Sequence, residues 1–497
     1  MYKYVILLLL GVKTMVCGAM PEGLNPTDAN VYGHVVDKHT REHLPFMTVA
    51  LKGTTIGAAT DATGHYFLRN LPEGKFTVVV TAVGYKRQER EVVLKKGLTL
   101  ELNFEVEEDQ VALDEVVVSA NRNETTRRQA PAIVKVLDTK LFEATGASCL
   151  AEGLGFQPGV RVENNCQNCG FQQVRINGLD GPYTQILIDS RPVFSALSGV
   201  YGLEQIPANM IERVEVVRGG GSALFGSSAI AGTINVITKE PQRNSAQVAH
   251  MTDMIGGKSV FDHATSLNAS LVSDNHKGGV YVFAQSRFRS EYDHDGDGYS
   301  ELPKLKSKTA GMRSFLKTGT YSRLMVEYHT IHEFRRGGNS MNLPPHEADI
   351  AEQVEHDINT GGVKFDYFSP NERSRFSLFS SMQHIDRESY YGVKRDPNAY
   401  GNTADLTYVG GGQFFYHFNR LVFMPSDLTL GAEFNYDELA DRIKGYGRDL
   451  TQRTRIYSVF LQNEWKDNRW SILLGGRLDK HNMLDHVVFS PRVNLRF

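Results

Sequence analysis

The chain has 497 residues, of which 41% are hydrophobic, 10% aromatic and 22% charged. With 54 Lys and Arg against 57 Asp and Glu, the formal net charge is −3, so there is no basic excess for a nucleic-acid partner. The length is too great for one compact domain, and a mean hydropathy of −0.32 excludes a bundle of membrane helices. What remains is a multidomain protein rich in Gly, Tyr and Phe, a composition that favours all-β architecture.

The N-terminus carries the features of an export signal. Lys3 precedes an apolar run at 4–12 that is too short to cross a bilayer as a helix. Gly18 and Ala19 offer a cleavage point, so we predict a signal peptide at residues 1–19. No later stretch is apolar enough for a membrane helix, so a membrane-spanning part of this chain must be built from strands.

Short strands at close spacing occupy residues 28–108. Apolar and polar residues alternate at 76–81 and 98–102, and turn residues such as Gly64 separate the strands. This pattern predicts a β-sandwich. The segments 33–37, 60–67 and 83–85 resemble the carboxypeptidase regulatory-like domain. We find no nucleophile with a nearby base and no metal-ligand cluster here, and therefore expect a spacer or docking module.

The linker at residues 109–126 contains one short apolar strand. It follows an acidic stretch and precedes a polar, charged segment, and its residues are Leu113, Asp114, Glu115, Val116, Val117 and Val118. Taken alone it is an edge strand of the sandwich. In a linker it is a detachable strand, which can add to an exposed sheet edge of a partner through backbone hydrogen bonds.

The most specific motifs lie in residues 127–241. They are QVRINGLDGP at 173–182, QILIDSRPV at 185–193, IERVEVVRG at 211–219 and SALFGSSAIAGTINVIT at 222–238. This segment closely resembles the plug domain of TonB-dependent outer-membrane receptors. The resemblance implies that residues 113–118 are the TonB box, the segment that the energy-coupling protein TonB binds. Together with the sandwich, this makes the chain resemble the Bacteroidetes-type members of that family over essentially its whole mature length.

Three charged residues of the segment alternate with valines. Arg213, Glu215 and Arg218 therefore occupy the polar face of a strand. The resemblance implies that such charges lie between the plug and the barrel wall, and we expect ion pairs there. Ordinary solvated surface is the alternative.

Three cysteines remain after signal removal, namely Cys149, Cys166 and Cys169. Gly170 follows the second Cys of the CxxC motif where haem attachment requires His, and no local His completes a zinc site. We predict a disulfide, either local or to Cys149; a soft-metal contact such as copper and free thiols are the alternatives. The resemblance places ligand contacts in apical loops at 164–172 and 191–202. The ligand-contact candidates are Cys166, Cys169, Tyr183, Phe194 and Tyr201, and core packing is the alternative for the three aromatic residues.

Beyond Pro241, at residues 242–497, strict alternation dominates. Around residues 428–436, apolar side chains such as Leu430 alternate with polar ones such as Glu433, over the span that a transmembrane barrel strand requires. A soluble sandwich would also alternate, but short turns at 369–372 and 466–469 alternate with long loops at 334–357, 390–405 and 441–453. We count about twelve strands, whereas plugged barrels have 22. The expected fold is thus β-dominated: a sandwich, an α+β plug, and the first half of a barrel in a truncated or fragmentary sequence.

One loop of this region is acidic. Asp293, Asp295 and Asp297, followed by Gly298, match the first half of an EF-hand calcium loop. Position twelve is Lys304 instead of Glu, and helical flanks are missing. A Ca²⁺ site and a solvated acidic hairpin loop both remain open.

The function implied by the resemblance is energy-coupled import through the outer membrane of a scarce, large ligand. Iron-siderophore is the first expectation, with haem or cobalamin next. TonB and outer-membrane lipids are the expected partners, with a surface lipoprotein as a further one. The alternatives are a surface adhesion or docking protein anchored by a barrel, and a glycan importer. No Ser/His/Asp set or carboxylate pair indicates an enzyme, and no cofactor is required.

Overall fold

The computed structural model describes residues 27–497 except 46, 62, 83–84, 108–115, 121, 124, 128–129, 165, 167–169, 171, 193–197, 227, 258, 372 and 468. The predicted signal peptide, the first half of the predicted TonB box (Leu113, Asp114 and Glu115), Cys169 and Phe194 lie outside the described residues. None of the described helices has the length and apolar character needed to cross a membrane.

The N-terminal domain is a β-sandwich, as predicted. Its two sheets have four strands each, and alternate residues of both sheets meet in one core, in which Val31, Val49, Val78 and Phe104 are fully buried. The first sheet contains β1 (Asn30–Asp37), β4 (His65–Leu68), β7 (Thr99–Glu101) and β8 (Phe104–Val106). The second contains β2 (Thr48–Leu51), β3 (Gly57–Ala59), β5 (Gly74–Thr81) and β6 (Gln88–Leu94).

The second domain, hereafter the plug, is built on a mixed four-stranded sheet in the order β11-β15-β16-β14. These strands are β11 (Val134–Asp138), β15 (Ile211–Arg218), β16 (Gly232–Thr238) and β14 (Thr184–Ile188), and β12 (Val160–Asn164) pairs separately with β13 (Gln172–Ile176). The helical elements are α2 (Thr139–Thr145), α3 (Leu150–Leu154), η1 (Gly181–Tyr183), α4 (Ser198–Gln205), η2 (Ala208–Met210) and α5 (Ser222–Phe225).

Local signals set the ends of α2. The side chain of Asp138 accepts a hydrogen bond from Leu141 N at 3.0 Å, which satisfies one of the unpaired amides at the helix start. Gly146 closes the helix in the left-handed region, with φ of 64°. Phe142 is thereby held in the plug core with Leu150 and Leu154.

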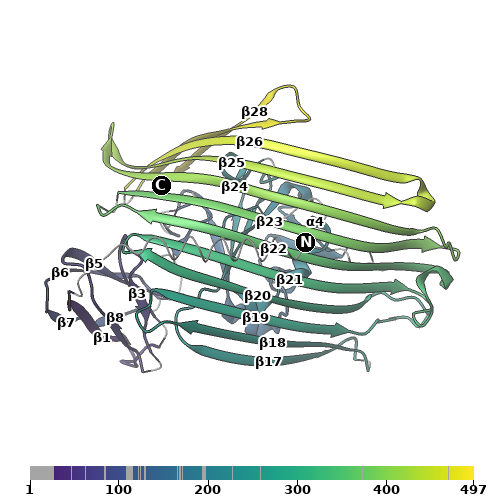
Figure 1. The fold of residues 1–497 in the computed structure, drawn as a ribbon, viewed down its shortest axis with the longest axis horizontal. Coiled ribbons are helices and arrows are strands. Elements are labelled where there is room, and N and C mark those ends of the chain that lie inside the picture. Colours follow the sequence, from purple (N-terminus) through teal and green to yellow (C-terminus); the bar gives the residue numbers. More distant parts are fainter. Residues whose placement is uncertain are drawn as a thin grey trace, which may run out of the picture.

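The C-terminal half forms one twelve-stranded antiparallel sheet, hereafter the wall, in which each strand pairs with its neighbours in the chain and β17 and β28 are the edges. Its strands are β17 (Ser245–Met254), β18 (Phe261–Val272), β19 (Gly278–Arg289), β20 (Lys304–Gly319), β21 (Ser322–Gly338), β22 (Ile350–Phe368), β23 (Ser374–Val393), β24 (Tyr400–Leu421), β25 (Met424–Ile443), β26 (Arg448–Lys466), β27 (Ser471–His481) and β28 (Val487–Arg496). Figure 1 shows the plug behind the long strands of the wall.

The two faces of the wall differ as the alternation predicts. On β25, Leu430 is 48% exposed on the outer face, whereas Thr429 and Glu433 on the inner face are 1% and 6% exposed. On β27, Leu474 is exposed and Arg477 is buried. The apolar side chains therefore point away from the plug, and the polar ones point toward it.

The two ends of the wall also differ. Short turns such as 320–321 and 422–423 close one end, and the other end carries longer connections such as 290–303 and 339–349. The predicted loops at 334–357, 390–405 and 441–453 are too long, because the strands continue past their apolar spans and leave only 339–349, 394–399 and 444–447. Backbone pairing does not need an apolar face, so alternation underestimates strand length.

The sandwich lies at the short-turn end (Figure 1). Thr55 N donates a hydrogen bond to Thr320 O, and Thr55 Oγ1 donates to Gly319 O, each at 3.1 Å. The sandwich is therefore attached to the wall at the end of the short turns.

Candidate functional site

The end of the predicted TonB box is docked against the plug. Strand β9 (Val116–Val117) pairs with β10 (Thr125–Thr126) in a two-stranded ribbon. The Val117 side chain is fully buried in an apolar cluster of plug and linker residues, with Ala120, Ala130, Val134 and Val217. The linker strand therefore packs on the plug and not on the sandwich.

Glu215 anchors this segment. Its Oε2 accepts hydrogen bonds from Val118 N and Ser119 N, both at 2.9 Å, and from Ser119 Oγ at 2.6 Å. Arg213 Nε donates to Oε1 at 2.9 Å. The carboxylate is fully buried, and four donors satisfy it, which is the condition under which a buried charge is tolerated.

These contacts correct the predicted roles of the three charges on β15. Arg213 and Glu215 pair with each other inside the plug, and Arg218 pairs with no carboxylate among the described residues. The physical reason is that β15 is an inner strand of the plug sheet, between β11 and β16. The face that carries Arg213 and Glu215 is covered by the linker and not by the wall, and Arg218 lies on the opposite face.

A hydrogen-bond relay continues from Ser119 into the plug. Asn235 Nδ2 donates to Ser119 Oγ at 2.9 Å and to Ser190 Oγ at 3.0 Å, and Ser190 N donates to Asn235 Oδ1 at 2.8 Å. Asp189 and Ser190 have φ values of 48° and 65°. Non-glycine residues pay a conformational cost in this left-handed region, so the surrounding contacts must hold the turn in place.

Asp189 carries the relay to the wall. Its Oδ2 accepts from Arg313 Nη1 of β20 at 2.5 Å and from Thr238 Oγ1 at 2.8 Å. Burial alone would raise the pKa of the Asp189 carboxyl, but Arg313 and Arg191 hold that pKa below its ordinary value. Arg191 itself pairs with Glu327 of β21. The turn that contains Asp189 and Arg191 is therefore held against the wall by ion pairs, with the Asp189 carboxylate ionised.

A second ion-pair group ties the linker to the wall. Arg122 pairs with Glu433 of β25, which also accepts from Arg477 Nη1 of β27 at 2.9 Å. The Arg122 guanidinium lies between the rings of Phe225 and Phe460, 4.7 Å from each centroid. The chain is thus fastened both to the plug and to the wall within a few residues of the predicted TonB box.

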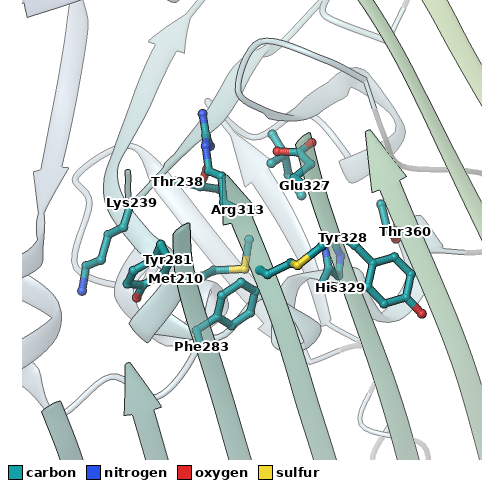
Figure 2. A pocket seen from close by; sticks show the side chains of 12 residues that line it. Met210, Thr238, Lys239, Tyr281, Phe283, Arg313, Glu327, Tyr328, His329 and Thr360 are labelled. Carbon is teal, nitrogen blue, oxygen red and sulfur yellow. The ribbon is translucent and has the colours of Figure 1, made fainter. Parts of the chain in front are cut away.

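An apolar contact lies between these polar ones. Met210 of η2 lies beside Tyr281 and Phe283 of β19 (Figure 2), and all three belong to the buried core of the plug. Tyr281 Oη donates to Asn209 O at 2.7 Å. The cavity at this contact is only about 20 Å³, roughly the room of one water molecule. Plug and wall are therefore closely packed here.

A larger cavity lies on the sandwich side of the plug. It measures about 570 Å³ and is bounded by the sandwich, the plug and the wall. The cationic side chains that line it include those of Arg87, Arg213, Arg323, Lys364 and Arg375.

Three known families match the chain in succession. Residues 31–118 match the CarboxypepD_reg-like domain, residues 126–233 the TonB-dependent Receptor Plug Domain, and residues 261–497 the TonB dependent receptor-like, beta-barrel family. The chain belongs to the TonB-dependent receptor family. The resemblance inferred from the sequence motifs is thus confirmed, and so is the β-dominated fold.

Curated relatives and solved structures agree with this assignment. The Ferric enterobactin receptor of Pseudomonas aeruginosa is 31% identical over 78% of this chain and 59% of its own length. The Vitamin B12 transporter BtuB of Vibrio vulnificus is 24% identical over 65% of this chain and 50% of its own length. The siderophore receptor PirA from Acinetobacter baumannii has the same fold, with a TM-score of 0.63 at 18% identity over 74% of this chain and 59% of that one. The chain spans between a half and three fifths of these relatives.

In this TonB-dependent receptor, one predicted apical loop lies at the long-loop end. Cys166 Sγ donates to Glu352 Oε2 at 3.0 Å, at the start of β22. Arg335 Nη1 donates to Gly170 O at 3.3 Å and pairs with Glu204 of the plug. Cys166 and Gly170 are thereby placed where the wall carries its longer connections.

The other cysteine contacts differ from the prediction. Cys149 has a free thiol, is 1% exposed and begins α3, where Arg287 Nη1 approaches its Sγ at 3.6 Å. A disulfide from Cys149 to Cys166 is therefore not formed, because α3 holds Cys149 in the plug core while Cys166 lies at the apical loop. The pairing of Cys166 with Cys169 stays a prediction.

The remaining ligand-contact candidates stay predictions. Tyr183 is 46% exposed at the end of η1. Tyr201 lies in α4, but its side chain is outside the described part of the chain, as is Phe194.

Sequence motifs did not point to several residues that join linker, plug and wall. They are Arg122, Asp189, Arg191, Asn235 and Glu433. One feature of the sequence could have indicated them. Asp189 and Arg191 are charged residues next to apolar strands, and charged side chains in such a position need either solvent or an ion pair.

The acidic triplet lies in the connection at 290–303. One carboxylate oxygen from each of Asp293, Asp295 and Asp297 lies within 4.8 Å of the others. Gly296 N and Gly298 N donate to Asp293, and both glycines have positive φ, at 83° and 90°. The loop therefore gathers its carboxylates at the long-loop end of the wall.

Proposed function

We propose that this chain takes up a large, scarce ligand across the outer membrane, with energy delivered through TonB. One observation carries the proposal: Glu215 binds the backbone of Val118 and Ser119, at the end of the segment that TonB would grip. A segment held by a few hydrogen bonds and one buried valine is releasable, whereas the same segment inside a sheet would not be.

The contacts suggest how a pull is passed on. TonB adds a strand to residues 113–118, which requires β9 to leave β10. Tension then reaches Ser119, whose hydroxyl bonds both Glu215 and Asn235. Asn235 also holds the strained turn of Ser190, next to the Asp189–Arg313 ion pair. Loss of the first contacts removes support from the turn that holds the plug against the wall.

We propose an iron-siderophore complex as the first ligand class, with haem or cobalamin next. Support comes from relatives named for ferric enterobactin, siderophores and vitamin B12. The expected partners are TonB, outer-membrane lipids around the apolar outer face of the wall, and a surface lipoprotein at the long-loop end. The predicted signal peptide would export the chain from the cytoplasm on its way to the outer membrane.

The test removes residues 113–118 from the full chain in cells that lack their own receptors. Ferric enterobactin and cyanocobalamin, each radiolabelled, serve as separate probes of surface binding and of uptake. Uptake of at least one probe should fall to background, while its binding to the cell surface stays unchanged. A matched control, Gln110→Ser in the same linker, should leave both unchanged.

The same experiment distinguishes uptake from the alternative function, that of a surface adhesion or docking protein. In that case the deletion changes neither binding nor retention of a probe at the surface, and no accumulation inside the cell depends on residues 113–118. Uptake that persists in the deletion variant contradicts energy coupling through this segment.

A further inference from the structure

Three histidines that are far apart in sequence meet on one face of the N-terminal sandwich. His34 on β1 and His65 on β4 are register partners in an antiparallel pair, so their side chains lie on the same face. His43 follows in a loop that bridges to Val36. The ring centroids are 5.0 Å apart for His34 and His43, 4.9 Å for His43 and His65, and 5.8 Å for His34 and His65.

The backbone fixes this arrangement. Val35 N donates to Gly64 O at 2.9 Å, and Leu44 N donates to Val35 O at 2.8 Å, so β1 holds both neighbouring segments. Gly64 has φ of 77°, and a Cβ there would lie 2.8 Å from the Cβ of His43. A glycine is therefore required for His43 to lie this close to β4.

A second layer of contacts orients one of the rings. Thr63 Oγ1 donates to Asp61 Oδ1 at 2.7 Å and lies 3.0 Å from His65 Nδ1. Because the Thr63 proton is used toward Asp61, His65 Nδ1 donates its own proton to Thr63, which leaves the lone pair of Nε2 free. Histidines that bind metals commonly have such a partner on the second nitrogen.

The charge state of the cluster is also suited to metal binding. Partial burial, and then the neighbouring His43 and His65, lower the pKa of His34, while Glu101 acts weakly in the opposite direction. Hydrogen bonds from Thr63 and the backbone hold the pKa of Asp61 below its ordinary value, although burial opposes them. At neutral pH, His34 is therefore uncharged and Asp61 is ionised.

We propose that His34, His43 and His65 form a binding site for a divalent transition metal, with Zn²⁺ as the reference ion. Imidazole nitrogens are the ligands that Zn²⁺ and Cu²⁺ prefer, and three of them leave a fourth position for water or a partner. The rings are tilted or edge-on to one another in the structure, and their nitrogens do not yet converge. The χ2 torsion of histidine is broad, so ring rotation can bring them together without backbone movement. The sequence pattern does not reveal this cluster, because only the topology of the sandwich brings its members together.

The test titrates ZnCl₂ into the full chain in detergent micelles, with metal bound at equilibrium measured by calorimetry and dialysis. His43→Asn, a change in an exposed loop, should remove one bound Zn²⁺ per chain or weaken that site at least tenfold. The matched control is His39→Asn, an exposed histidine of the same domain outside the cluster, and it should leave the titration unchanged. Equal stoichiometry and affinity in both variants overturns the proposal.

A second measurement identifies the ligands directly. Cu²⁺ bound to the wild-type chain should show hyperfine coupling to three imidazole nitrogens in electron paramagnetic resonance, and the His34→Asn/His65→Asn variant should lose that signal. Thr63→Ala should weaken Zn²⁺ binding about 10- to 100-fold at unchanged stoichiometry, and Thr63→Ser should restore it. A Cu²⁺ spectrum without imidazole coupling contradicts the site, whatever the folding of the variants.

Discussion

Ser119 and Asn235 are joined by a hydrogen bond of 2.9 Å from Nδ2 to Oγ, which connects the residue after the predicted TonB box to β16, an inner strand of the plug. Both side chains are fully buried or nearly so. Ser119 donates its own proton to Glu215, so a single hydroxyl links the linker, β15 and β16. Disturbing any one of these three side chains should therefore loosen the docked segment.

Glu215→Gln should release the TonB-box segment. The amide keeps one acceptor oxygen and replaces the other with an NH2 group, so either the donors of Val118 and Ser119 or the Arg213 guanidinium lose their buried acceptor. Each such loss costs about 1–3 kcal/mol. Limited proteolysis should cut the linker at 109–120 several times faster than in the wild type. Glu212→Gln on the same strand is the control, and equal cutting rates in both variants would contradict the anchoring role.

Arg335→Leu should destabilise the apical contact strongly. Arg335 is 1% exposed and pairs with Glu204 of the plug and with Glu333 of its own strand, at 2.7 Å for the second pair. Removing the cation leaves two buried carboxylates, and such losses cost about 3–5 kcal/mol. The free energy of unfolding in urea, measured in micelles, checks this.

Two variants control that measurement. Arg442→Leu removes an exposed pair with Asp449, for which we expect less than about 1 kcal/mol. Adding Glu204→Gln and Glu333→Gln to Arg335→Leu should recover most of the stability. If the single and triple variants unfold alike, unpaired carboxylates are not the cause.

Leu430→Arg should be costly because Leu430 lies on the outer, apolar face of β25. A cation on the lipid-facing side of a membrane strand costs about 2–4 kcal/mol near the bilayer centre. Asn435→Arg, on the inner face of the same strand, should cost much less. Unfolding in lipid vesicles measures both, and similar losses would mean that the outer face is not in contact with lipid.

Cys149 gives a pH dependence with a definite sign. Burial, aided by the neighbouring Glu152, raises the pKa of its thiol to about 12, whereas an unfolded chain has a thiol pKa of about 8.5. The folded state therefore keeps the proton that the unfolded state loses, so its stabilising effect is complete below pH ~8.5 and declines as the pH rises toward 12.

The expected loss from this site between pH 8 and pH 10 is about 2 kcal/mol. Cys149→Ala should remove that part of the alkaline decline, and Cys166→Ala should leave it in place. Unfolding free energies at the two pH values check the difference. A decline that is identical in the wild type and in Cys149→Ala would show that the thiol ionises equally in both states.

We propose that the triplet of Asp293, Asp295 and Asp297 binds Ca²⁺ weakly. Three carboxylates supply charge, but Lys304 stands where an EF-hand loop has its bidentate Glu, so the dissociation constant should be about 0.1–1 mM. Luminescence of Tb³⁺ excited through nearby Tyr299 reports binding. Asp295→Asn should weaken it at least tenfold, and Asp274→Asn in a short turn should not. No Tb³⁺ signal in the wild type would contradict the site.

Strand β15 shows which features of a site the sequence predicts and which it does not. Alternation correctly placed Arg213 and Glu215 on one face of a strand, because the period of a strand is a local property. Arg218, three residues after Glu215, lies on the opposite face with Val214 and Val216, so its predicted position was wrong. Which surface covers the face with Glu215 depends on the order of strands in the sheet. Residue spacing does not determine that order, and so the linker, and not the wall, covers Glu215.

The sequence by itself determined the succession of domains, the strand character of the wall and the direction of its apolar face, because each follows from short-range patterns of hydrophobicity and turn residues. Only the tertiary structure decided which charges meet. Arg122 and Glu433 are distant along the chain, as are His34 and His65, and no local pattern pairs them. Arg122 meets Glu433 because the wall packs around the plug and its linker, and His34 meets His65 because β1 pairs with β4 in the sandwich. In both cases long-range packing decides which polar groups become neighbours.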